Sequence, residues 1–130
     1  MGSNAPISST YSFSSHDFGA GTGTESFRAP KNYTRGRLID VGVNNITEAY
    51  ACDTTEGAVR VGTSGDADAY AELNIADGTA TGDQFNTQDD ADAIIDADLD
   101  DTQIEVTYVQ CVDSGTAAGI ATPFVKVLWY

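Results

Sequence analysis

Helical periodicity is missing from this chain, and that feature limits the folds open to it. No stretch of 12 or more residues repeats apolar positions every 3.6 residues, as an amphipathic helix would. Short segments instead alternate apolar and polar residues, which is the period of a β-strand. Stretches rich in Gly, Ser, Thr and Asp separate these segments. The sequence therefore predicts an all-β protein with six to eight short strands.

Three segments give the strongest strand predictions. Residues 103–112 alternate with Ile104, Val106, Tyr108 and Val112 on one face. Residues 35–44 place Ile39, Val41 and Val43 on one face. Residues 124–130 form a β-branched and aromatic run that a Gly-rich loop joins to the first segment. We expect the first and last of these segments to pair with each other and end the sheet.

The size of the chain indicates one domain. Its 130 residues are 41% hydrophobic, which is enough for a modest core. Residues 1–10 are polar and rich in Gly, Ser and Asn, so they are predicted to form a flexible N-terminal arm. Residues 11–130 are predicted to form a single β-sandwich, either jelly-roll or immunoglobulin-like.

Charge narrows the classes of partner. The net charge of −14 disfavours nucleic acid and anionic membranes, since both repel an acidic surface. Four cations nevertheless lie close together in the sequence: Arg28, Lys31, Arg35 and Arg37. The segment 61–125 contains no Lys or Arg and holds 14 of the 20 acidic residues. We expect the four cations to contact a partner, while the acids either maintain solubility or form a separate acidic face.

The two cysteines and the N-terminal residues bear on three features: a metal site, a disulfide and a targeting signal. Cys52 and Cys111 have neither CxxC spacing nor clustered His partners, so a zinc site is not predicted. Two buried free thiols are the default interpretation, and a disulfide requires the fold to bring the two residues together. No apolar run approaches the ~18 residues of a membrane span, and residues 1–10 do not resemble a secretory signal.

Catalytic motifs are scarce in this sequence. We therefore expect that the chain is not an enzyme and that it needs no cofactor. His16 is the single histidine and is expected to lie on the surface or to pack against neighbours, because no nucleophile is adjacent to it in the sequence. Asp113-Ser114-Gly115 resembles the triplet of retroviral-type aspartic proteases, but only 15 residues follow it. A turn after a strand explains these three residue types better.

A group of aspartates is the only candidate for metal binding. Asp96, Asp98 and Asp100 are spaced like the start of an EF-hand loop, yet Asp101 and Thr107 stand where that loop needs Gly and Glu. No metal is therefore predicted. A looser calcium site formed by Asp96, Asp98, Asp100 and Asp101, with help from Asp66, Asp68 or Asp92, is the weaker alternative to a solvated acidic loop.

Several segments together resemble one family. They are residues 35–40 (RGRLID), 61–70 (VGTSGDADAY), 115–120 (GTAAGI) and 125–130 (VKVLWY). With the polar arm, they resemble the head decoration, or cement, proteins of tailed bacteriophages. The resemblance implies a β-sandwich, often a homotrimer, that sits on the outer surface of the virion capsid and bridges major capsid subunits. It also implies that residues 28–37 face the capsid and that the acidic loops 77–101 face outward.

One other function is compatible with the sequence. The alternative function is a carbohydrate- or host-surface-binding β-sandwich module of a phage fibre, with or without calcium. Exposed aromatic residues in loops would favour it, but Phe85 is the only large apolar residue in residues 77–90.

Overall fold

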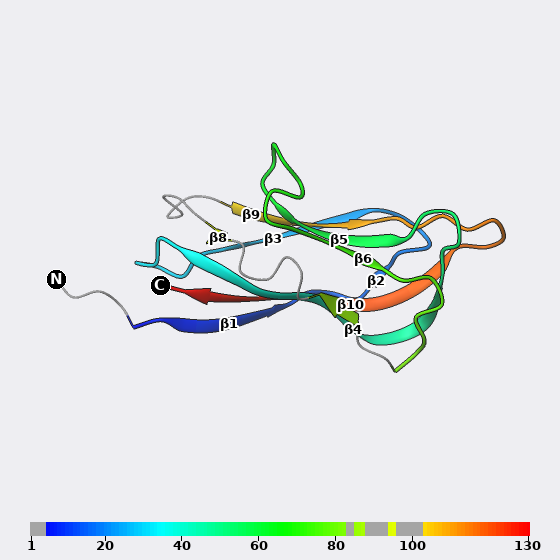
Figure 1. The fold of residues 1–130 in the computed structure, drawn as a ribbon, viewed down its shortest axis with the longest axis horizontal. Coiled ribbons are helices and arrows are strands. Elements are labelled where there is room, and N and C mark those ends of the chain that lie inside the picture. Colours follow the sequence, from blue (N-terminus) through cyan, green and yellow to red (C-terminus); the bar gives the residue numbers. More distant parts are fainter. Residues whose placement is uncertain (1–4, 83–84, 88–93, 96–102) are drawn as a thin grey trace.

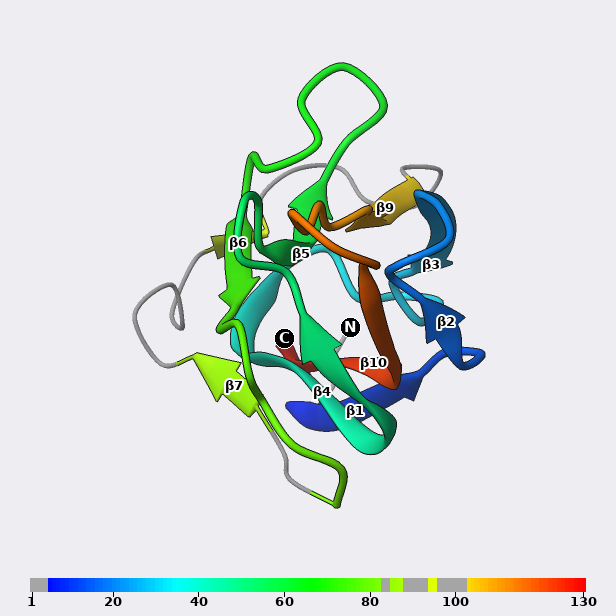
Figure 2. The ribbon, with the colours of Figure 1, turned by 90° about the vertical axis from the view of Figure 1, so that its right-hand side faces the viewer.

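Two antiparallel sheets pack face to face in the computed structural model of this protein (Figure 1). The structure describes residues 5–82, 85–87, 94–95 and 103–130, and these residues contain strands and connections but no helix. The prediction of an all-β, single-domain β-sandwich is confirmed. Figure 2, viewed along the sandwich, shows the two sheets enclosing a common interior.

The first sheet is built around the last strand of the chain. Its main path runs in the order β1 (Ile7–Ser12), β10 (Ala118–Trp129), β4 (Gly36–Ala51) and β7 (Phe85–Thr87). Two short strands extend it, since β2 (His16–Asp17) pairs with β10 and β8 (Ile94–Ile95) pairs with β4. All these pairs are antiparallel. β10 therefore joins the beginning of the chain to its middle.

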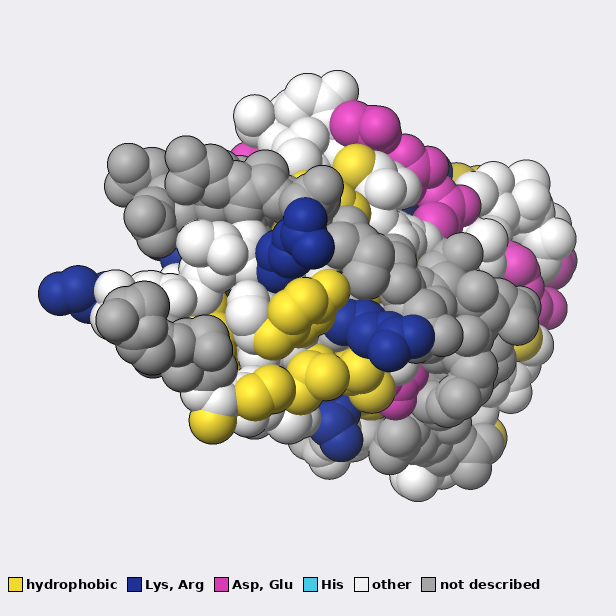
Figure 3. Space-filling view, turned by 60° about the vertical axis from the view of Figure 1, so that its left-hand side comes forward, with side chains coloured by type: hydrophobic (Ala, Val, Ile, Leu, Met, Phe, Trp, Pro, Cys, Tyr) yellow, Lys and Arg dark blue, Asp and Glu magenta, His cyan; other side chains and the backbone are white. Residues whose placement is uncertain are grey.

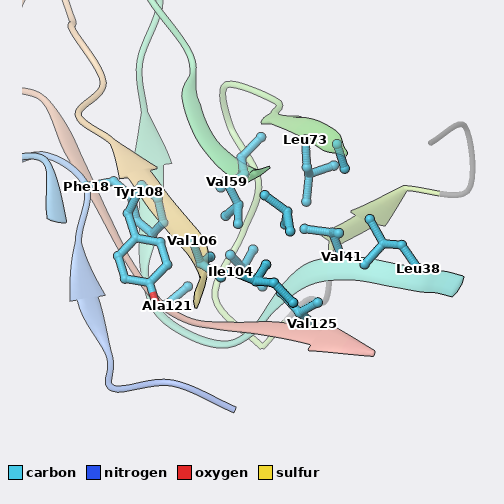
Figure 4. Close-up of a cluster of buried hydrophobic side chains, with 14 of the residues drawn as sticks. Phe18, Leu38, Val41, Val59, Leu73, Ile104, Val106, Tyr108, Ala121 and Val125 are labelled. Atoms are coloured by element: carbon cyan, nitrogen blue, oxygen red, sulfur yellow. The ribbon is translucent and has the colours of Figure 1, made fainter. Parts of the chain in front are cut away.

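The second sheet has four strands in the order β3 (Gly23–Arg28), β9 (Gln103–Val109), β5 (Gly57–Gly62) and β6 (Ala71–Ile75). Its inward side chains meet those of the first sheet in one hydrophobic cluster (Figure 4). Val59 and Val106 from this sheet and Leu38 and Val125 from the other are fully buried. Burying such side chains contributes roughly 1.5–3 kcal/mol each, so the interface between the sheets is the main source of stability.

A β-bulge changes which residues of β4 face the core. Lys126 pairs with Asp40 and Val127 pairs with Leu38, so one residue of β4 is left over at Ile39. Leu38 is consequently buried and Ile39 is only half-buried. The predicted face of Ile39, Val41 and Val43 was right for the two valines and wrong for Ile39, because a bulge shifts the alternation by one residue.

The alternation of residues 103–112 holds only as far as β9 extends. Ile104, Val106 and Tyr108 are buried as predicted, whereas Val112 is 47% exposed and Cys111 is buried instead. The predicted pairing of this segment with residues 124–130 is also wrong. β9 pairs with β3 and β5 in one sheet, while β10 lies in the other. The loop between them crosses from sheet to sheet.

Part of the predicted N-terminal arm, residues 1–10, belongs to a strand. Ile7 pairs with Trp129, and β1 continues in regular register as far as the pair formed by Ser12 and Phe124. The Tyr11 ring stacks on Phe27 of the other sheet at 4.4 Å between ring centroids, and its hydroxyl accepts a hydrogen bond from Trp129 Nε1 at 3.0 Å. Residues 7–10 are therefore part of the sheet, and the flexible-arm prediction was wrong for them.

The cysteines form a disulfide rather than two free thiols. Cys52 follows β4 and Cys111 follows β9, and their Cα atoms lie 5.5 Å apart, within the range of disulfides. Both residues are buried. The free-thiol interpretation was wrong because the fold brings together the segments that follow β4 and β9, which are 59 residues apart in the sequence. The bridge links the two sheets just after β4 and β9. These two strands end on the side of the sandwich opposite both termini (Figure 1).

Candidate interaction surface

The four predicted partner-binding cations lie in two different places. Arg28 ends β3 in the second sheet, and Lys31 lies in the connection from β3 to β4. Arg35 and Arg37 lie on either side of Gly36 at the start of β4 in the first sheet. All four side chains are exposed. The end of β3, the start of β4 and the connection between them lie toward the end of the sandwich that carries both termini (Figure 1).

Gly36 sets the direction of Arg35 and Arg37. A Cβ built on Gly36 would come within 2.7 Å of Trp129 Cζ3 and 2.8 Å of Val127 Cγ1, so this position faces the core. Neighbouring residues of a strand point to opposite faces. Arg35 and Arg37 therefore point to the outer face of the first sheet, in agreement with their exposure.

Three residues of the C-terminal segment join them on that outer face. Tyr130 exchanges two backbone hydrogen bonds with Arg35, at 3.2 and 3.0 Å, and Leu128 pairs with Arg37. Lys126 is exposed two positions earlier, whereas Val125, Val127 and Trp129 point into the core. We call this surface the basic–apolar face, and its members are Arg35, Arg37, Lys126, Leu128 and Tyr130. The acidic Asp40 pairs with Lys126 and lies on the same side of the sheet.

The basic–apolar face combines cations with apolar area. Tyr130 is 41% exposed and Leu128 is half-buried. Figure 3 shows a strip of hydrophobic side chains with Lys and Arg side chains on either side of it. Apolar contact area next to charges that guide approach is typical of a protein-binding surface.

The other two cations, Arg28 and Lys31, line a hollow at the end of the sandwich. It has a volume of about 350 Å³ and is lined by Arg28, Ala29, Pro30, Lys31 and Asn32. A turn shapes it, because Tyr33 N donates to Pro30 O at 3.1 Å and Asn32 has a positive φ of 72°. The Tyr33 hydroxyl donates to Ala5 O at 2.6 Å and so ties this connection to the beginning of the described chain.

The opposite end of the sandwich is acidic and tightly hydrogen-bonded. Asp53 accepts hydrogen bonds from Ser114 N at 2.7 Å and from Ser114 Oγ at 2.6 Å, while its own N–H donates to Asp113 Oδ1 at 2.9 Å. Asp113 also accepts from Gly115 N at 2.9 Å, which confirms that this triplet forms a turn. The hydrogen bonds from the Ser114 hydroxyl and N–H lower the pKa of Asp53 below its ordinary value of 3.8.

His16 packs against neighbours, as predicted. Its Nε2 lies 2.8 Å from Gly21 O, and its ring lies 4.8 Å from that of Phe18 and 5.0 Å from that of Tyr108, measured between centroids. The predicted calcium alternative cannot be placed, because Asp96, Asp98 and Asp100 lie outside the described residues, as do Asp92 and Asp101. The described part of the chain has no cluster of three or more His, Cys, Asp or Glu that could hold a metal ion.

Lys126, Leu128 and Tyr130 are the members of the basic–apolar face that sequence reasoning missed. The signal was present in the alternation of residues 124–130, where Val125, Val127 and Trp129 are the inward set. The outward set could not be placed beside Arg37, because that requires knowledge of the pairing of β10 with β4.

Comparison with known proteins yields little. No family model matches the chain, and no curated protein matches it. Among solved structures, the chain is similar to a chain in the structure of infectious bursal disease virus, Gx strain, with 13% identity and a TM-score of 0.28. The match covers 98% of this chain and 32% of that one. A likeness at this TM-score carries no argument about function. No helix among the described residues has the length and apolar character needed to span a membrane.

Proposed function

We propose that this protein is a structural virion protein that decorates the outer surface of a bacteriophage capsid and stabilises it by bridging major capsid subunits. The observation that carries the proposal is the basic–apolar face on a chain whose net charge is −14. It gathers half of the six Lys and Arg residues of the chain around exposed apolar area. The family resemblance of residues 35–40 and 125–130 supports it, because both segments contribute to this face.

Physical reasoning explains how such a face would work. Surface cations guide the approach to an acidic partner, and the apolar area of Leu128 and Tyr130 provides contact energy once water is excluded. The face lies on paired strands of a disulfide-linked sandwich, so little conformational entropy is lost when it docks. No chemical step is part of the proposed role.

The test uses phage heads that lack this protein. We expect the wild-type protein to bind such heads and to raise the temperature at which they rupture. The variant Arg35→Glu/Arg37→Glu should lose binding, because its charges would then repel an acidic partner. Retention of wild-type occupancy by this variant would contradict the proposal.

A matched control separates the face from overall charge. The variant Arg28→Glu/Lys31→Glu changes the net charge by the same amount but alters the hollow instead of the basic–apolar face. The sequence led us to expect that Arg28 and Lys31 also contact the partner, but the proposal leaves them out because they line the hollow and lie outside the basic–apolar face. We therefore expect this variant to bind heads nearly as well as wild type. Equal loss in both variants would mean that overall charge rather than this face governs docking. Binding to a glycan array, with no binding to heads, would replace the proposal with the host-surface module.

A further inference from the structure

β1 lies at the edge of its sheet, and no other described strand pairs with the side of its backbone that points away from β10. It ends the strand order, and β10 is its partner among the described strands (Figure 2). The register from Ile7 to Ser12 contains no bulge. Such an edge offers a row of donors and acceptors to any strand that reaches it.

The hydrogen-bond pattern shows which groups face outward. Phe13 N donates to Pro123 O at 3.0 Å, so the odd-numbered residues of this segment direct their N–H and C=O groups to β10. Tyr130 exchanges its backbone hydrogen bonds with Arg35, so the even-numbered residues of this part of the chain face β4. The odd-numbered residues of β10 therefore face β1, and they are the residues paired with the odd-numbered residues of β1. The N–H and C=O groups of Ser8, Thr10 and Ser12 therefore point away from the sheet.

The usual protections of an edge are missing from β1. Edge strands are commonly guarded by charged residues, proline or a bulge, and β1 (ISSTYS) contains none of these. The edge strands of the second sheet differ, since β3 carries Glu25 and Arg28, and β6 carries Glu72. In a chain with a net charge of −14, an uncharged edge is a place where two copies can approach without direct repulsion.

We propose that two copies of this chain associate through β1, strand against strand and antiparallel, about a two-fold axis at Thr10. The outward groups of Ser8, Thr10 and Ser12 are symmetric about Thr10. A two-fold rotation pairs Thr10 with Thr10 of the second copy and Ser8 with Ser12 of the second copy. Every outward N–H and C=O of β1 then has a partner, and a single sheet runs through both copies.

The side chains fit the same register. Ser8, Thr10 and Ser12 are exposed on the outer face of the sheet, where hydrogen bonds between hydroxyl groups of opposite strands are favourable. On the inner face, Ile7 comes opposite Phe13 of the second copy, which would cover an isoleucine that is 39% exposed in the single chain. The proposal thus accounts for one of the few exposed large hydrophobic residues. It gives a dimer, whereas the family resemblance implies a homotrimer.

The mass in solution is the first test. Light scattering or sedimentation should give twice the chain mass of 13.6 kDa. Thr10→Pro removes an outward N–H without touching the bonds to β10, so it should give a folded monomer with an unchanged circular dichroism spectrum. Thr10→Val keeps the backbone groups and should remain a dimer. A wild-type monomer, a trimer, or a dimeric Thr10→Pro variant would overturn the proposal.

Cysteine cross-linking tests the register. Opposed residues in a hydrogen-bonded antiparallel pair have Cα atoms about 5.5 Å apart, which suits a disulfide. Thr10→Cys should therefore cross-link with itself under mild oxidation. Ser8→Cys and Ser12→Cys should each fail alone and cross-link when mixed. Equal self-cross-linking by all three variants would indicate random collision and contradict the two-fold pairing. These measurements use the isolated protein, so they do not depend on head binding.

Discussion

Gly36 lies directly against the indole of Trp129, so that a Cβ at this position would come within 2.7 Å of Cζ3. Trp129 is fully buried and cannot move aside without disturbing the core. Gly36→Ala is therefore expected to lower the free energy of unfolding by about 1–3 kcal/mol. Urea unfolding followed by tryptophan fluorescence measures it, because Trp129 is the single tryptophan.

Gly21→Ala is the matched control, because a Cβ there would meet no atom within 4 Å. Its stability should equal or slightly exceed that of wild type. Equal stability of Gly36→Ala and Gly21→Ala would contradict the packing described for Trp129.

Removal of one buried hydroxyl should stabilise the protein. The Tyr108 side chain is buried, and its hydroxyl has no hydrogen-bond partner among the described residues. Burial of that hydroxyl also raises the pKa of Tyr108. Tyr108→Phe removes an unsatisfied polar group at nearly constant shape, so the free energy of unfolding should rise by about 1 kcal/mol. Thermal unfolding monitored by circular dichroism checks the sign.

Tyr11→Phe should have the opposite effect on stability from Tyr108→Phe. The Tyr11 hydroxyl accepts a hydrogen bond from Trp129 Nε1, and its loss leaves a buried indole N–H without that acceptor. We expect this variant to be less stable than wild type by about 1–2 kcal/mol. Destabilisation by both substitutions to the same extent would mean that the two hydroxyls are not distinguished by hydrogen bonding.

The disulfide should contribute substantially to stability. Cys52 and Cys111 are 59 residues apart, and closing a loop of that length in the unfolded chain corresponds to about 4 kcal/mol. Cys52→Ala/Cys111→Ala is expected to lose most of this amount in urea unfolding. Reduced wild-type protein should behave like the double variant. A wild-type protein that reacts with alkylating reagents before reduction would contradict the bridge.

Acid should weaken the acidic end of the sandwich. Hydrogen bonds from Ser114 lower the pKa of Asp53 in the folded state, so its carboxylate stabilises the fold above the ordinary value of 3.8. This contribution is lost as the pH falls through the lowered pKa. The stability difference between wild type and Asp53→Asn should therefore be largest near neutral pH and should narrow below pH 3.8.

Asp68→Asn is the control for that pH dependence, because Asp68 is an exposed loop residue on a different connection. This variant changes the net charge by the same amount but leaves the hydrogen bonds between Ser114 and Asp53 in place. A constant difference between wild type and Asp53→Asn across the acid range would contradict the role given to the Asp53 carboxylate.

The alternation of apolar and polar residues was enough to predict strands, but it did not predict which strands pair with each other. Ile104, Val106 and Tyr108 were correctly predicted to face the core, because alternation within one strand is visible in a single sequence. The exposure of Ile39 was not predictable, since a bulge exists only relative to the strand opposite it. The pairing of Cys52 with Cys111 likewise depends on two loops meeting across the sandwich.

The candidate site shows the same limit. Arg35 and Arg37 stood out because cations are rare in this chain, and their exposure follows from Gly36. Lys126 is remote from them in sequence and joins them only because β10 lies beside β4. A surface assembled from distant strands cannot be derived from sequence spacing alone.

The central place of β10 has a consequence for synthesis of the chain. Ile7 is made more than a hundred residues before its partner Trp129. During translation, β1 therefore lacks its folded-state partner until β10 has been made, and the first sheet can be completed only then. Its serines and threonine make the waiting segment less prone to aggregation than an aliphatic strand would be. The composition that leaves β1 open for pairing would also keep it soluble while it is alone.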